Sequence, residues 1–175
     1  MQTIKVYTDG SCINNSKSKQ GLSYGGYGCH ILYPNNEIEE FSGGISGSKI
    51  TNNVGELLAF KKGIERCISL NVTDIVHIYS DSSYVLNIFS KWIEKWKKNG
   101  WKKDKGKLIE NLELIQEIYK MINESNTIII YKKVKAHQNE PVKSSPEWYH
   151  WYGNDRADLL AKECANDMKD ISDNN

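Results

Sequence analysis

Four acidic side chains stand at positions from which they could hold a divalent cation together. Asp9 and Asp81 each follow a short apolar, β-branched run, so both are predicted at the carboxyl ends of strands. Open α/β sheets place their ligands at that edge. Glu56 falls in the first turn of one predicted helix, and Asp158 falls early in the last. Gathered acids repel one another and keep their protons unless a cation neutralises them. Oxygen donors without a Cys or His cluster indicate Mg²⁺ or Mn²⁺.

Each acid also has an ordinary structural explanation, and spacing alone does not bring the four together. These explanations are a turn at Asp9-Gly10, a helix N-cap at Asp81, a capping box between Asn53 and Glu56, and an i,i+4 ion pair between Asp158 and Lys162.

The elements that must position the acids predict an α/β fold. Apolar runs separated by turn residues predict strands over about 4–11, 24–33, 37–45, 75–80 and 127–134. Helical periodicity predicts helices over about 51–69, from 81 onward, 111–123 and 154–168. Short connections favour antiparallel pairing of the first three strands, and helical crossovers favour parallel addition of the last two. We expect a mixed five-stranded sheet with helices on both faces.

The totals limit the class of protein. The chain has 175 residues, which suits one domain with its own core, and its formal net charge is +1. The four scattered cysteines form no CxxC pair, which favours free thiols over a zinc site or a disulfide framework. No signal segment is evident, and no apolar run approaches the roughly 18–20 residues of a membrane helix. We expect a soluble intracellular protein, in the cytoplasm or the nucleus, that does not associate with a membrane.

Five short motifs follow one another along the chain: Tyr7-Thr8-Asp9-Gly10-Ser11, Thr51-Asn52-Asn53 with Glu56-Leu57 three residues on, Ser80-Asp81-Ser82, Val134-Lys135-Ala136-His137, and Gly153-Asn154-Asp155-Arg156-Ala157-Asp158. Between the third and fourth lies a basic, tryptophan-rich segment of about residues 90–107. In order and content these features resemble type 1 ribonuclease H, and the match runs from residue 4 to about 165. The basic segment resembles that family's handle. The resemblance implies one domain over 1–168, followed by a frayed polar tail over 169–175.

The resemblance implies an activity: endonucleolytic hydrolysis of the RNA strand of RNA–DNA hybrids. By it, Asp9, Glu56, Asp81 and Asp158 are the catalytic, metal-binding carboxylates. Two Mg²⁺ ions, which Mn²⁺ can replace, would activate water and stabilise the leaving oxygen, giving 5′-phosphate and 3′-hydroxyl ends. The matching His137 would assist product release or proton transfer, although a loop histidine is usually only solvated.

The resemblance also assigns substrate contacts, and each has a structural alternative. Asn15, Asn52 and Asn53 match residues that touch minor-groove sugars and bases, although loops are rich in Asn for turn reasons. Thr51 and Asn111 match residues of a pocket for a DNA phosphate. Tyr84, Trp92 and Trp96 match aromatic residues that form a channel for the DNA strand. Lys97 and Lys98 are the phosphate-binding lysines of the handle. The tryptophans could instead be core residues of the handle, and the lysines a solvated face.

The chain departs from the family at residues 138–153, a long insertion rich in aromatic residues and proline. Part of it could pack over the last helix and alter how His137 approaches the metals, or it could pack on itself at the surface. We also expect no separate N-terminal hybrid-binding domain, and hence hybrid affinity that falls with salt.

Two rival functions remain at this stage. One is another nuclease of the same superfold, such as a junction resolvase, which the handle and the paired Asn motif disfavour. The other is a catalytically silent hybrid-binding module, which would have no need to keep four acids beside a phosphate backbone. The expected partner is an RNA–DNA hybrid, bound by a monomer without an obligatory protein partner.

Overall fold

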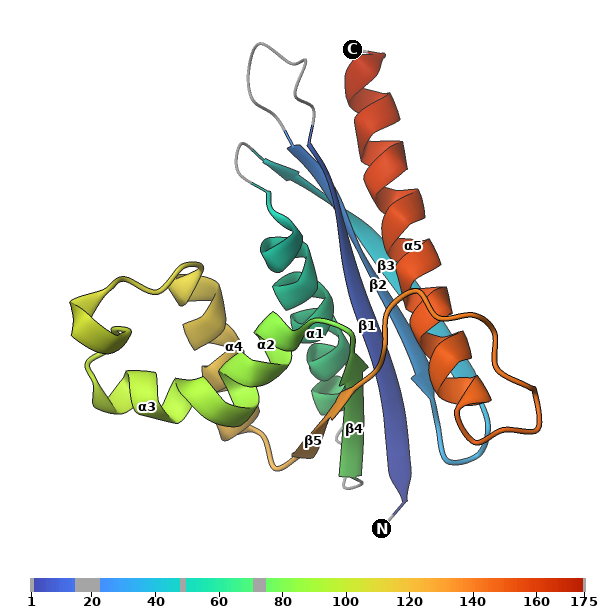
Figure 1. Ribbon diagram of the computed structural model, residues 1–175, viewed down its shortest axis with the longest axis horizontal. Helices are drawn as coiled ribbons and strands as arrows, with labels where there is room; N and C mark the ends of the chain where they lie inside the picture. The colour runs from blue at the N-terminus through green and yellow to red at the C-terminus, as the bar shows by residue number, and fades with distance from the viewer. Residues whose placement is uncertain (1, 15–22, 48–49, 71–74, 175) are drawn as a thin grey trace.

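A computed structural model describes residues 2–14, 23–47, 50–70 and 75–174 of the protein (Figure 1). Five strands form one sheet in the order β3-β2-β1-β4-β5. They are β1 (Thr3–Asn14), β2 (Ser23–Leu32), β3 (Ile38–Gly47), β4 (Ile75–Ser80) and β5 (Ile128–Lys133). The first three pair antiparallel, and β4 pairs in parallel with both β1 and β5. The predicted mixed sheet is confirmed.

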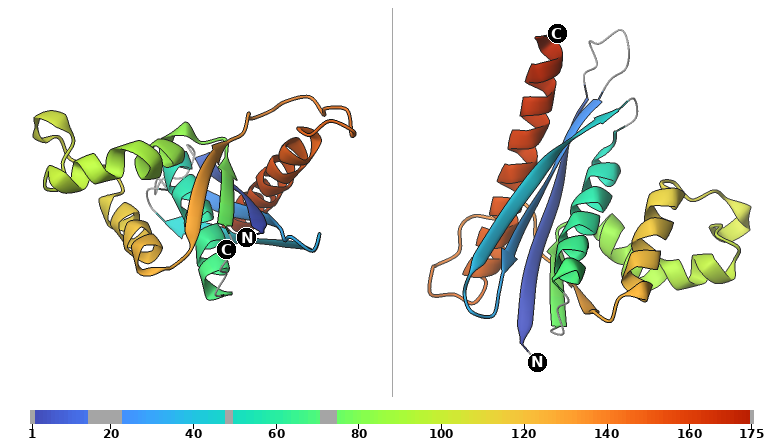
Figure 2. Two further views of the ribbon diagram at one scale, coloured as in Figure 1. Left: turned by 90° about the horizontal axis from the view of Figure 1, so that it is seen from below. Right: turned by 180° about the vertical axis from the view of Figure 1, so that it is seen from behind.

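Helices cover both faces of the sheet, as expected (Figure 2). They are α1 (Asn52–Ser69), α2 (Ser83–Asn87), α3 (Ile93–Lys98), α4 (Leu112–Glu124) and α5 (Trp148–Asp173). A π-helical turn (Ile88–Trp92) joins α2 to α3, and a 3-10 turn (Asp104–Gly106) follows α3. α1 and α5 lie on opposite sides of β1, while α3 and the segment after it project away from the sheet (Figures 1 and 2).

Side chains along β1 alternate between these two helices, as the period of a strand requires. Val6 and Thr8 face α1, because a Cβ built on Gly63 would lie 2.9 Å from each of them. Tyr7 faces α5, because a Cβ on Gly153 would lie 2.6 Å from its ring. Glycine at these two helical positions lets α1 and α5 pack closely against β1.

The strand β1 is longer than the sequence suggests. Asp9-Gly10 has the composition of a turn, yet β1 continues through both residues to Asn14, pairing with β2. A Cβ on Gly10 would lie 2.2 Å from the backbone carbon of Gly55, so this glycine serves the close approach of α1. The prediction that Asp9 ends its strand is therefore wrong. It lies within β1, just past the ladder with β4, which ends at the Tyr7–Tyr79 pair.

The helix α5 begins six residues earlier than the predicted residue 154 and runs to Asp173. Its first turns are anchored to the sheet: Tyr7 Oη lies 2.9 Å from His150 Nδ1, and Tyr149 Oη lies 2.9 Å from His30 Nε2. The last six residues of the insertion, 148–153, are thus a helical extension. Residues 169–173, expected to be a frayed tail, are helical as well.

No helix within the described ranges combines the length and the apolar character that a membrane crossing requires.

Candidate active site

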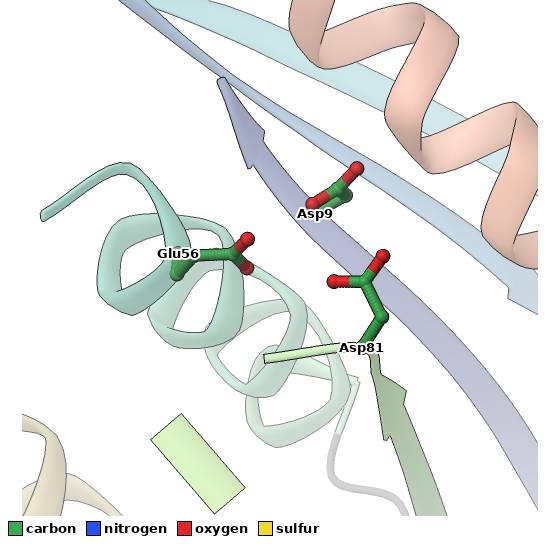
Figure 3. A group of neighbouring side chains, drawn as sticks. All are labelled: Asp9, Glu56 and Asp81. Carbon is green, nitrogen blue, oxygen red and sulfur yellow. The ribbon is translucent and has the colours of Figure 1, made fainter. Parts of the chain in front are cut away.

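Three carboxylates converge where β1 passes the end of β4 (Figure 3). Asp9, Glu56 and Asp81 each offer one oxygen, and these oxygens lie within 4.8 Å of one another. Asp81 directly follows β4, and Asp9 lies just beyond the last β1–β4 pair. Glu56 reaches the same point from the beginning of α1. The fold therefore delivers acids from three separate segments to one edge of the sheet.

The contact between β1 and α1 fixes where Glu56 stands. A Cβ on Gly10 would lie 2.3 Å from the backbone nitrogen of Glu56. Since real Cβ atoms do not approach backbone that closely, only glycine at position 10 lets the first turn of α1 sit against the strand.

Burial and mutual repulsion disfavour negative charge on this cluster. Burial, followed by the charges of Glu56 and Asp81, raises the pKa of Asp9 to about 10. Burial is also the largest cause that raises the pKa of Glu56 to about 8. Without a counter-cation the cluster therefore retains protons at neutral pH.

The donor set fits a hard divalent cation. All three ligands are carboxylates, the donors that Mg²⁺ and Mn²⁺ prefer. Glu56 Oε2 is buried and has no hydrogen-bond partner within the described part of the chain. A buried carboxylate oxygen without a donor is costly, and a metal ion at the centre of the cluster would satisfy it.

The fourth predicted acid lies beside this group rather than within it. Asp158 Oδ2 accepts a hydrogen bond of 2.5 Å from Lys162, the i,i+4 partner anticipated from the sequence. The nearby Asp158 carboxyl also contributes, after burial and the charges of Glu56 and Asp81, to raising the pKa of Asp9. With Asp81 and His137 it lines a cavity of about 40 Å³ next to the three-acid group. Asp158 thus makes the ordinary ion pair and borders the site as well.

The ordinary explanations for Asp81 and Glu56 do not hold. The N-cap of α2 is Ser82, whose side chain accepts from the Val85 amide. The N-cap of α1 is Thr51, whose hydroxyl accepts from the Val54 amide. Neither acid is engaged as a cap, which leaves both carboxylates free to face Asp9.

Two neighbours of Asp81 were not singled out from the sequence. Lys133, at the end of β5, donates from Nζ to the Asp81 backbone oxygen, and its charge lowers the pKa of Glu56. The buried Asn154 of α5 donates from Nδ2 to Asp81 Oδ2 at 3.5 Å. The Gly-Asn pair of the last motif was a signal for Asn154, whereas a lysine at a strand end gave none.

His137 lies on an exposed loop after β5, at the rim of the cavity. Its φ of 48° is in the left-handed region, which is unusual for a residue other than glycine. The chain must therefore hold this turn by other contacts.

The predicted substrate residues are brought together only in part. Asn15 lies outside the described residues. Thr51, Asn52 and Asn53 form the start of α1, next to Glu56, with Thr51 and Asn52 exposed. On either side of the handle in sequence, Asn111 and Tyr84 meet, and the Asn111 amide donates to the Tyr84 hydroxyl at 3.2 Å.

The two handle tryptophans differ in exposure. Their ring centroids are 5.7 Å apart, but Trp96 is 8% exposed and belongs to the core, whereas Trp92 is 38% exposed. Lys97 and Lys98 are exposed, and Lys97 also donates to Tyr119 at 3.2 Å. Trp96 is therefore a core residue, whereas the ring of Trp92 is partly exposed to solvent.

The family model for RNase H matches residues 1–166 of the chain. The chain belongs to the ribonuclease H family. A ribonuclease H of Pseudoalteromonas atlantica is 34% identical over 165 residues, covering 94% of this chain and 92% of that protein. A ribonuclease H of Acetivibrio thermocellus is 37% identical over 142 residues, covering 79% and 86%. The chain is accordingly a ribonuclease H hydrolase, a nuclease of a metal-dependent family.

Solved structures support the same fold. The solution structure of the PFV RNase H domain has a TM-score of 0.73 at 23% identity and covers 93% of this chain and 94% of that one. LC11-RNase H1, solved in complex with an RNA/DNA hybrid, has a TM-score of 0.59 at 20% identity and covers 94% and 97%. The ribonuclease H fold expected from the sequence is confirmed.

Proposed function

We propose that this ribonuclease H cuts the RNA strand of RNA–DNA hybrids endonucleolytically with two divalent metal ions, leaving 5′-phosphate and 3′-hydroxyl ends. The observation that carries the proposal is the convergence of Asp9, Glu56 and Asp81, with a buried oxygen of Glu56 left without a donor. A relative of the same fold has been solved with an RNA/DNA hybrid, which supports this substrate class.

Asp9, Glu56 and Asp81 would hold the metal, and Asp158 would complete the set from α5. When bound, Mg²⁺ supplies an acidified water and charge neutralisation for the departing oxygen, and Mn²⁺ can replace it. With a cation held among them, these carboxylates would be in their ionised form, because its positive charge offsets their mutual repulsion. Asn154, bonded to Asp81, orients that carboxylate.

His137 stands where it could exchange a proton with the departing strand or ease its release. Its exposed imidazole shares the cavity with Asp81 and Asp158 but lies outside the group of three acids. A histidine suits this task because an imidazole can both donate and accept a proton.

The hybrid would lie across the start of α1 and the handle. Asn52 and Asn53 adjoin the acids and can both donate to and accept from a ribose 2′-hydroxyl; Asn15 is assigned to the same task from the resemblance alone. Thr51 and Asn111 would take a DNA phosphate, and Tyr84 with Trp92 would contact the DNA strand. Trp96 supports that surface from the core.

The exposed Lys97 and Lys98 would bind phosphates, so hybrid affinity should fall with salt. The enzyme would act as a monomeric domain.

The proposal is tested with a labelled hybrid beside single-stranded RNA, duplex RNA and duplex DNA, each with Mg²⁺ and with EDTA. We expect cutting of the hybrid's RNA strand alone, only with metal, and 5′-phosphate ends on the products. Cleavage of branched duplex DNA would favour the resolvase, and hybrid binding without cleavage in either metal would favour the silent module.

A further inference from the structure

The insertion over residues 138–153 returns to the chain that carries His137. Its last turns are the beginning of α5, held on the sheet by the Tyr7–His150 and Tyr149–His30 hydrogen bonds described above. The same helical turn carries Trp151. The indole N–H of Trp151 donates to the backbone oxygen of Gln138 at 3.1 Å. A helix whose first turn is hydrogen-bonded to the sheet thus also hydrogen-bonds to the residue next to His137.

A second hydrogen bond closes the turn from within. Gln138 Nε2 donates to the backbone oxygen of Lys135 at 3.1 Å, so the turn that contains His137 is tied at both ends. Left-handed backbone at a residue other than glycine is energetically unfavourable and persists only where neighbours enforce it. The φ of 48° at His137 is therefore a conformation that these two hydrogen bonds help to maintain.

The same tryptophan faces the reaction site. Trp151 lines the cavity of about 40 Å³, together with Gln138, His137, Asp81 and Asp158. The insertion is therefore neither remote from the site nor packed only on itself.

We propose that Trp151 is a positioning residue, which sets the place of His137 through the backbone of Gln138. This inference rests on the proposed function, because His137 acts only if the hybrid is cleaved. Loss of the indole donor would let the His137 turn relax, which slows the step that needs the imidazole without changing how the hybrid docks on the handle.

The test compares Trp151→Phe with a matched control from the same segment. Phenylalanine keeps an aromatic ring at position 151 and removes only the N–H donor. Trp148 is the control, because its indole donates to the exposed Glu140 carboxylate at 3.0 Å and not to the backbone of the His137 turn. Each change is made in the native chain and in His137→Ala, and hybrid cleavage is measured at steady state.

For Trp151→Phe we expect kcat to fall about 3- to 10-fold with KM within about twofold, since small misplacements of a participating group act on the rate. In the His137→Ala background the same change should have no further effect, because coupled residues are non-additive. Trp148→Phe should stay within about twofold in both backgrounds. A native rate for Trp151→Phe, or an equal loss with and without His137, would overturn the proposal.

Amide hydrogen exchange gives a readout that does not depend on cleavage. Exchange at residues 135–138 should be faster in Trp151→Phe and unchanged in Trp148→Phe, and equal protection would also overturn the proposal. If the native protein does not cut hybrids, the proposed function fails while this positioning contact is still measured. If Trp151→Phe does not fold, Trp151→Leu, which also lacks the indole N–H, must show the same coupling to His137 or the inference falls.

Discussion

Gly10 and Gly55 face each other where β1 passes the first turn of α1, yet the structure predicts opposite outcomes when alanine replaces each of them. A Cβ on Gly10 would lie 2.2 Å from the Gly55 carbon, 2.3 Å from the Glu56 nitrogen and 2.6 Å from the Gly55 oxygen. All three are backbone atoms, which cannot rotate away. A Cβ on Gly55 would lie 3.5 Å from its nearest neighbours across the contact, an ordinary van der Waals distance.

For Gly10→Ala, α1 must retreat by about 1 Å to restore normal contact, which carries Glu56 away from Asp9 and Asp81. Overpacking of this kind costs about 1–3 kcal/mol or more, and a displacement near 1 Å at a reacting centre can cost about 100-fold in rate. Gly55→Ala should instead be neutral or gain about 0.5–1 kcal/mol, because it replaces glycine within a helix.

Urea unfolding and Mg²⁺-dependent hybrid cleavage would be measured on both variants. We expect Gly10→Ala to lose stability and at least about tenfold in kcat, and Gly55→Ala to keep both within about twofold or 1 kcal/mol. Equal behaviour of the two variants, or native activity in Gly10→Ala, would show that the α1–β1 contact does not place Glu56.

Four further predictions follow from the same structure. Asp9→Asn should stabilise the metal-free protein at pH 7: burial raises the Asp9 pKa from 3.8 to about 10, so folding takes up a proton there at a cost of at most about 4 kcal/mol. We expect a gain of about 1–3 kcal/mol in urea unfolding, shrinking as pH falls towards 4; a loss at pH 7 would contradict this. The hydrogen bond from the Arg156 guanidinium is the largest cause that lowers the pKa of Glu40 to about 2. Glu40→Gln should therefore lose about 1 kcal/mol or less of unfolding free energy above pH 4.5, and the difference from the native protein should vanish as pH falls towards 2. Gly28→Ala should lose more than about 2 kcal/mol in thermal unfolding, because its Cβ would lie 2.2 Å from a backbone oxygen of α5; a native melting temperature would refute the close packing. Lys97→Ala and Lys98→Ala should each reduce the slope of log affinity against log salt by about 1 or less, and unchanged slopes would place the hybrid elsewhere.

The order and pairing of the strands could be predicted from the sequence, because their signals are local. The run 75–80 is apolar and ends at a polar cluster, and β4 has those bounds in the structure. The length of β1 could not be predicted in this way. Gly10 resembles a turn residue by type, and only contact with α1, which is distant in sequence, shows why a strand carries glycine there.

The start of α5 was missed for a similar reason. Residues 148–153 show no clear helical stripe of apolar residues, and the helix is anchored by Tyr149 and His150 bonding to side chains of β1 and β2. Such partners, more than a hundred residues away, leave no local pattern. Two glycines of β2 likewise serve a contact that is distant in sequence, because a Cβ on Gly26 or Gly28 would lie 2.2 Å from a backbone oxygen of α5.

The candidate site, too, could be predicted from the sequence only in part. The likeness to a known family brought Asp9, Glu56 and Asp81 together, since each acid alone was equally compatible with a turn or a cap. The structure adds that the caps are other residues and that Asp158 stands slightly apart. Lys133 and Asn154 entered the description only through contacts with Asp81, which spacing does not encode.

The most direct test of the central claim compares the native protein with Asp9→Asn on one labelled RNA–DNA hybrid, with binding and cleavage measured on the same samples in Mg²⁺. If the three acids hold the catalytic metal, the native protein cuts the RNA strand, while the variant binds within about threefold and cuts at least about 1,000-fold more slowly. Cleavage by the variant at the native rate, or binding without cleavage by the native protein, would contradict the account.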